Sequence, residues 1–124
     1  MNKVIKPLGS MLVVVATLVA ATHAFAHAHL ERASPPANGS VRNAPREVAI
    51  WFSENLERSF SSITVVDSSG SRVDQGDSQV DSRNRKIMRV TLKPLAPGRY
   101  KVNWRVLSVD THKTEGSYNF RVTP

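Results

Sequence analysis

The stretch Tyr100-Lys101-Val102-Asn103-Trp104-Arg105-Val106 has the cleanest alternation of apolar and polar residues in the chain. Successive side chains of a β-strand point to opposite faces of the sheet. The aromatic and valine side chains of this stretch are therefore predicted to face a core, whereas Lys101, Asn103 and Arg105 face water. This strand is the strongest local indication of fold in the sequence.

Shorter runs of the same kind lie on both sides of it. Strands are predicted at 48–52, 63–66, 86–92 and 118–122, and turn residues such as Asn38-Gly39 and Pro97-Gly98 separate the predicted strands. The polar segment 67–84 is predicted to be a long loop that holds one edge strand. No long stretch after residue 26 has a helical period, so the sequence predicts an all-β sandwich or barrel of about seven strands.

The residues before the central strand refine this fold class. Tyr100 follows the turn Leu95-Ala96-Pro97-Gly98-Arg99 and begins the strand. A tyrosine in this position is similar to the tyrosine corner of immunoglobulin-like sandwiches, where its hydroxyl hydrogen-bonds to nearby backbone. We therefore expect a structural role for Tyr100.

The N-terminal residues have the pattern of a secretory signal peptide. Lys3 and Lys6 precede an apolar run of eleven residues at 11–21, and Ala24-Phe25-Ala26 supplies a small-x-small cleavage site. The run is too short for a membrane-spanning helix, which needs about 20 residues. Residues 1–26 are predicted to be the signal, and residues 27–124 are predicted to form one exported domain in the periplasm.

Composition excludes several classes of site. Removal of Lys3 and Lys6 lowers the formal net charge from +7 to +5, and the chain has no cysteine. Disulfides and thiolate metal sites are thus excluded. Met88 is the only methionine after residue 26, which argues against a thioether site for monovalent copper. We expect a monomer with no nucleic-acid partner and no direct membrane insertion after cleavage.

The histidines after residue 26 fall in two places, His27 and His29 at the predicted cleavage site and His112 near the C-terminus. Cleavage before His27 would give it a free amine, which can chelate one metal ion together with its imidazole. Asp110 and His112 are two residues apart, so in an extended chain their side chains point the same way. Amine, imidazoles and carboxylate form a ligand set that suits divalent copper.

A second arrangement stays open. In His27-Ala28-His29 the free amine, two backbone amides and the His29 imidazole can surround copper in a square plane, without Asp110 or His112. Ala26-His27-Ala28 is also small-x-small, so cleavage could instead expose His29.

Several motifs together resemble those of one protein family. Besides His27, they are Ser34-Pro35-Pro36-Ala37-Asn38-Gly39-Ser40, Phe52-Ser53-Glu54-Asn55-Leu56, Leu95-Ala96-Pro97-Gly98-Arg99-Tyr100-Lys101-Val102-Asn103-Trp104-Arg105, Ser108-Val109-Asp110-Thr111-His112 and Gly116-Ser117-Tyr118-Asn119-Phe120. The chain resembles the CopC family of periplasmic copper-resistance proteins. This resemblance implies an immunoglobulin-like Greek-key fold and one Cu(II) ion per chain. It implies that His27, Asp110 and His112 bind the metal and that Glu54 is an outer-sphere hydrogen-bond partner.

The resemblance implies a non-enzymatic carrier or buffer that delivers copper to a CopD-type inner-membrane partner. Some family members carry a methionine-rich loop, but segment 67–85 has no methionine, so a single site is expected. Two other functions stay open. One is an oxidative copper enzyme with a histidine brace, and the other is a metal-free immunoglobulin-like interaction module.

Overall fold

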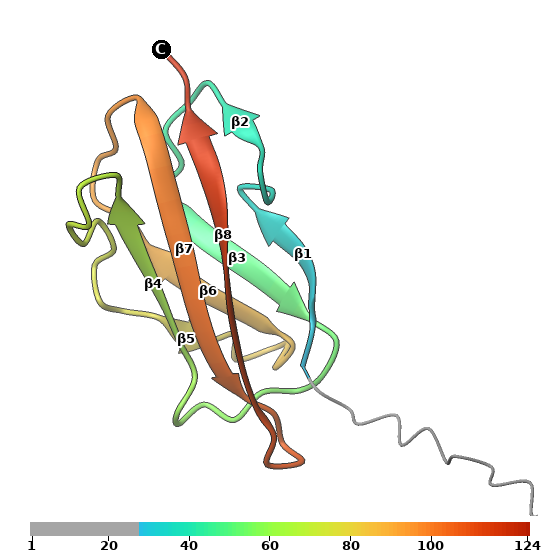
Figure 1. The fold of residues 1–124 in the computed structure, drawn as a ribbon. Helices are drawn as coiled ribbons and strands as arrows, with labels where there is room; N and C mark the ends of the chain where they lie inside the picture. The colour runs from blue at the N-terminus through green and yellow to red at the C-terminus, as the bar shows by residue number, and fades with distance from the viewer. Residues whose placement is uncertain (1–27) are drawn as a thin grey trace, which may run out of the picture.

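A computed structural model describes residues 28–124, so the predicted signal peptide and His27 lie outside the described residues (Figure 1). Two four-stranded sheets pack face to face. One sheet has the order β1 (Leu30–Ser34), β3 (Glu47–Phe52), β6 (Ile87–Thr91), β5 (Gln79–Val80). The other has the order β2 (Ser40–Val41), β8 (Lys113–Val122), β7 (Gly98–Leu107), β4 (Ser62–Asp67). The all-β sandwich is confirmed, with eight strands in place of about seven.

The two strands that the sequence pattern does not predict are β1 and β2. In β1 the register shifts between Leu30 and Arg32, and such a bulge breaks the alternation of faces. Strand β2 has only two residues and pairs in parallel with β8, whereas the other strand pairs are antiparallel. Both strands therefore depend on partners distant in sequence.

The β7–β8 hairpin forms the centre of the second sheet, paired from Gly98 opposite Val122 to Leu107 opposite Lys113. The Tyr100 hydroxyl donates a hydrogen bond to the Ala96 carbonyl, which confirms the tyrosine corner. Trp104 faces the core, where its ring meets the edge of Phe52 at a centroid distance of 5.2 Å.

A glycine lets this indole lie against the neighbouring strand. Gly116 is directly opposite Trp104, and a Cβ at residue 116 would be 2.4 Å from the indole Cζ2. Any side chain at this position would displace the ring, so the close approach requires glycine.

Segment 68–86 is a long loop with one short edge strand, β5, which confirms the loop and edge strand predicted for 67–84. Aspartates hold the loop in place. Asp67 accepts hydrogen bonds from the backbone N–H groups of Ser69 and Ser71, and Asp81 accepts them from those of Arg83 and Asn84. These short side-chain turns order a polar segment that contributes little to the core. In the described part of the chain, no helix has the length and apolar character needed to cross a membrane.

Candidate metal centre

The turn between β7 and β8 brings the side chains of Asp110 and His112 together. Thr111 adopts a left-handed conformation with φ of 72°, and its N–H donates to the Ser108 carbonyl at 2.9 Å. The Ser108 N–H in turn donates to the His112 carbonyl at 3.0 Å. The prediction of an extended chain between Asp110 and His112 is therefore wrong. A tight turn, and not the period of a strand, makes the carboxylate and the imidazole converge.

The two groups have the spacing of neighbouring metal ligands. His112 Nδ1 lies 3.2 Å from Asp110 Oδ2, and the side chains are 40% and 36% exposed. Ligand atoms at right angles around a metal ion about 2 Å away lie about 3 Å apart, so both groups fit one ion. Both side chains are partly exposed to solvent, although the His112 Nδ1 atom itself is buried.

A buried serine positions the carboxylate. The fully buried Ser108 hydroxyl donates a hydrogen bond to Asp110 Oδ1. This hydrogen bond, with a further contribution from the hydrogen bond to His112, holds the pKa of Asp110 below its usual value although partial burial opposes the shift. Asp110 thus presents an ionised oxygen toward His112 at neutral pH.

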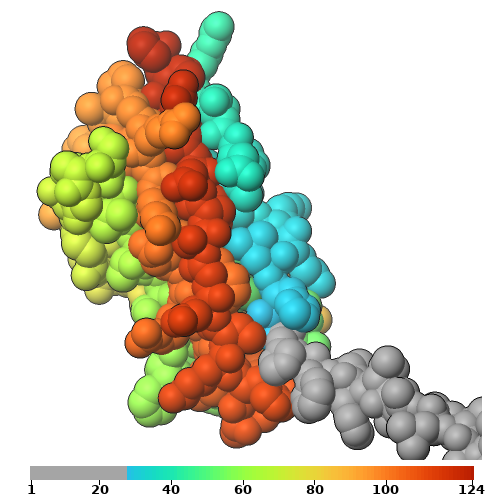
Figure 2. Space-filling model, in the orientation of Figure 1, coloured from blue at the N-terminus to red at the C-terminus, as the bar shows by residue number. Residues whose placement is uncertain are grey.

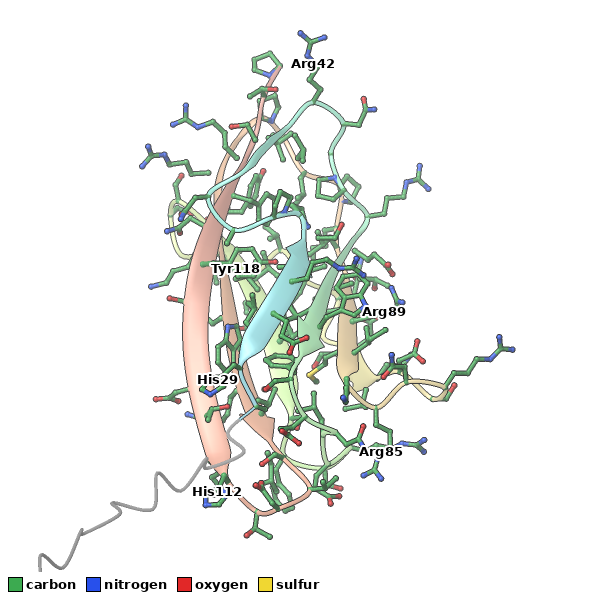
Figure 3. All side chains as sticks on the ribbon, turned by 90° about the vertical axis from the view of Figure 1, so that its right-hand side faces the viewer. His29, Arg42, Arg85, Arg89, His112 and Tyr118 are labelled. Carbon is green, nitrogen blue, oxygen red and sulfur yellow. The ribbon has the colours of Figure 1, made fainter. Side chains whose placement is uncertain are left out.

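The beginning of the described chain is fixed beside the same turn. The Ala28 carbonyl accepts a hydrogen bond from Thr114 Oγ1 at 2.9 Å, and Ala28 itself is buried. The backbone N–H of the next residue, His29, donates a hydrogen bond to Ser53 Oγ at 2.8 Å. The His29 carbonyl accepts a hydrogen bond from the Ser53 N–H, also at 2.8 Å. Figure 3 shows His29 and His112 at the same end of the sandwich.

Glu54 lies on the loop 53–61, which connects β3 to β4 and is hydrogen-bonded to both of these regions. The preceding residue, Ser53, is hydrogen-bonded to His29. The carbonyl of the following residue, Asn55, accepts a hydrogen bond from the Val109 N–H at 3.0 Å. The Glu57 N–H also donates to the Leu107 carbonyl at 2.7 Å. The backbone of half-buried Glu54 thus lies between residues that are bonded to the N-terminal segment and to the β7–β8 turn.

Residues 28–124 contain no group of three or more His, Cys, Asp or Glu side chains placed to hold a metal. Asp110 and His112 supply two candidate ligands from the described part of the chain, and a complete site needs more.

Comparison with known proteins identifies the type of domain. The CopC domain family model matches residues 30–123. The chain belongs to the CopC family. It is 37% identical to copper resistance protein C of Pseudomonas syringae pv. tomato over 106 residues, or 80% of this chain and 84% of that protein. It is 36% identical to copper transport protein CutJ of Bacillus subtilis over 99 residues, or 79% of this chain but 18% of that protein.

The fold agrees with this membership. The crystal structure of CopC from Methylosinus trichosporium OB3b superposes with a TM-score of 0.74 and 37% sequence identity, covering 79% of this chain and 95% of that one. The resemblance to the CopC family is confirmed, and the chain is a CopC-type copper resistance or transport protein.

Three residues that shape this end of the CopC domain were not among the predicted site residues. The hydroxyl of Ser53 is hydrogen-bonded to His29, that of Ser108 to Asp110, and that of Thr114 to Ala28. Serine and threonine are common in turns and on strand surfaces, so no local pattern distinguishes these three. Only the tertiary structure shows that each hydroxyl bonds to a residue at or beside a predicted ligand.

Proposed function

We propose that this protein is a periplasmic copper carrier that holds one Cu(II) ion with the amine and imidazole of His27, the imidazole of His112 and the carboxylate of Asp110. The observation that carries the proposal is the His112–Asp110 pair beside the anchored N-terminal segment. Glu54 is assigned the outer-sphere role, and the domain is assigned no catalysis.

The anchored Ala28 supports a ligand role for residue 27. Ala28 is bonded to Thr114, which is only two residues from His112. Consecutive Cα atoms are 3.8 Å apart, so a residue directly before Ala28 can approach the β7–β8 turn. Cleavage before His27 would then add two nitrogen ligands to the two groups that the turn supplies.

The same contacts favour this arrangement over the square plane of His27-Ala28-His29. That alternative needs deprotonated backbone amides as ligands, including the amide of His29. The His29 N–H, however, donates to Ser53 Oγ, and Ala28 is 1% exposed. Binding through these amides would break the Ser53 hydrogen bond and pull Ala28 out of the core.

The ligand chemistry supports the divalent ion. Nitrogen and carboxylate ligands suit Cu(II), whereas Cu(I) prefers thioethers and thiolates. The only methionine sulfur in the described residues belongs to Met88, which is 0% exposed in the core. A partly exposed site at one end of the sandwich also suits transfer of copper to a CopD-type membrane protein. The match within the much longer copper transport protein CutJ supports a role in copper transport.

Native mass spectrometry of the protein recovered from the periplasm, with added Cu(II), tests the proposal. We expect the mass of a chain that begins at His27 together with one retained copper ion. His112→Ala and Asp110→Ala should each weaken copper binding at least tenfold, because each removes a direct ligand. His29→Ala is the matched control and should retain copper. One additional residue before His27 should weaken binding strongly, because the amine becomes an amide.

The outcomes separate the alternatives. Loss of copper in His29→Ala with retention in His112→Ala would identify the square-planar site and reject the proposed one. No retained copper in the unsubstituted protein would leave an immunoglobulin-like module and contradict the carrier function.

A further inference from the structure

The outward face of the β7–β8 hairpin carries most of the net charge of the described chain. We call this surface the basic face. Residues 28–124 contain fifteen basic and ten acidic residues, but the basic face has five basic residues and one acid, which leaves ten basic and nine acidic residues elsewhere. Its charged members are Arg99, Lys101, Arg105, Lys113, Glu115 and Arg121.

The strand register gathers these residues on one side. Tyr100 and Phe120 pair and point into the core, so Arg99 and Arg121, which also pair, point outward. Like charges directly opposite each other on two strands destabilise a sheet. Neither arginine forms an ion pair with any residue in 28–124. An anionic partner would remove this repulsion.

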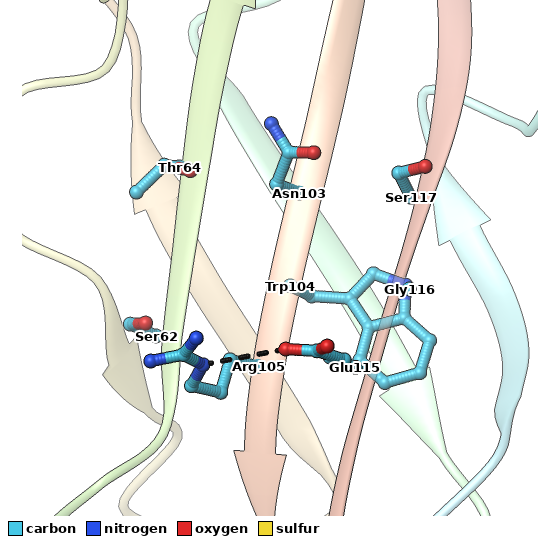
Figure 4. Close-up of a pocket in the computed structure, with 8 residues that line it drawn as sticks. All are labelled: Ser62, Thr64, Asn103, Trp104, Arg105, Glu115, Gly116 and Ser117. Atoms are coloured by element: carbon cyan, nitrogen blue, oxygen red, sulfur yellow. Dashed lines mark ion pairs between the residues drawn. The ribbon is translucent and has the colours of Figure 1, made fainter.

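The centre of the basic face is an open, polar depression. Figure 4 shows the short side chains of Thr64, Asn103 and Ser117 across three neighbouring strands, with the Arg105–Glu115 pair beside them. This pair is 3.5 Å apart and both side chains are more than 70% exposed, so it neutralises little of the surrounding charge. The face, turned toward the viewer in Figure 2, is an extended surface with open depressions.

An exposed aromatic residue lies at one end of the same face. Phe60 is 77% exposed, and it lines a depression together with Arg105 and Lys113. Its backbone is left-handed, with φ of 68°, which is an unusual conformation for a bulky side chain. An aromatic ring displayed beside basic side chains is a combination that binds at the interface of a membrane.

We infer that the basic face adsorbs to an anionic phospholipid bilayer, with its arginines and lysines at the lipid phosphates and Phe60 among the head groups. Five basic side chains spread along a two-stranded hairpin complement an extended array of phosphates better than a small-molecule anion. Adsorption in the head-group region agrees with the expected lack of membrane insertion. It would place the Asp110–His112 end of the domain near the membrane surface, and it does not depend on copper binding.

Flotation of the exported protein with vesicles tests the inference. We expect binding to vesicles of phosphatidylglycerol and phosphatidylcholine in equal parts, and none to pure phosphatidylcholine. The triple variant Arg99→Gln/Lys101→Gln/Arg121→Gln should lower the partition coefficient by about a hundredfold, because each basic residue near the surface contributes about fivefold. About 1 M NaCl should have a similar effect, since it shortens the Debye length to about 3 Å.

The matched control removes the same charge from elsewhere. Arg46→Gln/Arg83→Gln/Lys93→Gln changes three exposed residues outside the basic face, and its binding should stay within about threefold of the unsubstituted protein. Phe60→Asn, which removes the ring but tolerates the left-handed backbone, should weaken binding about tenfold.

Two results would overturn the inference. Equal loss of binding in the two triple variants would mean that net charge alone drives adsorption. Absence of binding to the anionic vesicles at low salt, with both variants folded by circular dichroism, would leave an acidic protein as the partner of this face.

Discussion

At the scale of single residues, the two tyrosines of the core differ in how their hydroxyls are satisfied. The Tyr100 hydroxyl donates to the Ala96 carbonyl. The Tyr118 hydroxyl is buried and has no hydrogen-bond partner among residues 28–124, and this burial raises the pKa of Tyr118 far above its usual value. A buried polar group without a partner costs free energy of folding.

We therefore expect Tyr118→Phe to leave the free energy of unfolding unchanged or to raise it by about 1 kcal/mol, because it removes the unsatisfied hydroxyl and keeps the ring. Tyr100→Phe is the control and should lower it by about 1 kcal/mol, because it deletes the tyrosine-corner hydrogen bond. Urea denaturation of both variants measures these changes. A clear loss of stability in Tyr118→Phe would show that its hydroxyl has a partner.

At the scale of elements, a buried carboxylate fixes the long loop that follows β4. Asp74 Oδ1 accepts a hydrogen bond from the Val65 N–H at 2.8 Å, and Oδ2 accepts one from the Gly76 N–H at 3.0 Å. The Arg72 guanidinium bonds to both oxygens, with Nε 2.9 Å from Oδ1 and Nη2 2.6 Å from Oδ2. Burial alone would raise the pKa of Asp74, but the bonds from Arg72 and from the two backbone amides outweigh it and lower the pKa.

Asp74→Asn should lower the free energy of unfolding by about 2 kcal/mol at neutral pH, because it weakens a buried, charge-assisted network. A depressed folded-state pKa contributes stability above the unfolded value, near ~3.9, and this contribution disappears as the pH falls through the folded value. The difference between the two proteins should therefore shrink in acid. Urea denaturation at pH values from neutral to strongly acidic measures this difference in the free energy of unfolding. A difference that stays constant over this range would show that the stabilisation does not depend on an ionised Asp74.

Asp67→Asn is the control for this loop. Asp67 caps a short exposed turn and bonds to Ser69 and Ser71, so its loss should lower the free energy of unfolding by clearly less than the loss of Asp74. An equal cost for both substitutions would mean that burial of Asp74 has no special effect.

At the scale of the whole molecule, the proposed copper site joins the N-terminal segment to the far end of the β7–β8 hairpin. Ala28 and Thr114 are already hydrogen-bonded across 86 residues of sequence. A metal ion bound by residues from both regions binds the folded state alone, and such binding adds to stability.

We expect Cu(II) at about one hundred times its Kd to raise the free energy of unfolding by about 2.7 kcal/mol. A thermal-unfolding scan with and without Cu(II) measures this increase. At the same Cu(II) concentration the gain should be smaller by at least about 1.3 kcal/mol in His112→Ala, which corresponds to binding weakened at least tenfold, and it should be unchanged in His29→Ala. An equal gain in both variants would contradict a site that uses His112.

The sequence by itself determined the sandwich, its central hairpin and the tyrosine corner. The alternation of 100–106 and 118–122 is a local property, because side chains of a strand point to opposite faces whatever the strand pairs with. The candidate ligands His112 and Asp110 were also found from sequence, since few histidines exist to choose from. Their ligand role, like that of His27 and Glu54, stays a prediction.

The tertiary structure alone decided what depends on pairing between distant residues. The two-residue strand β2 exists only against β8, and the bulge in β1 exists only against β3. The convergence of Asp110 with His112 needs the left-handed Thr111, and the position of Ala28 needs Thr114. The basic face likewise appears only when the register aligns β7 with β8. These features depend on long-range contacts, and no window of local sequence contains both partners of such a contact.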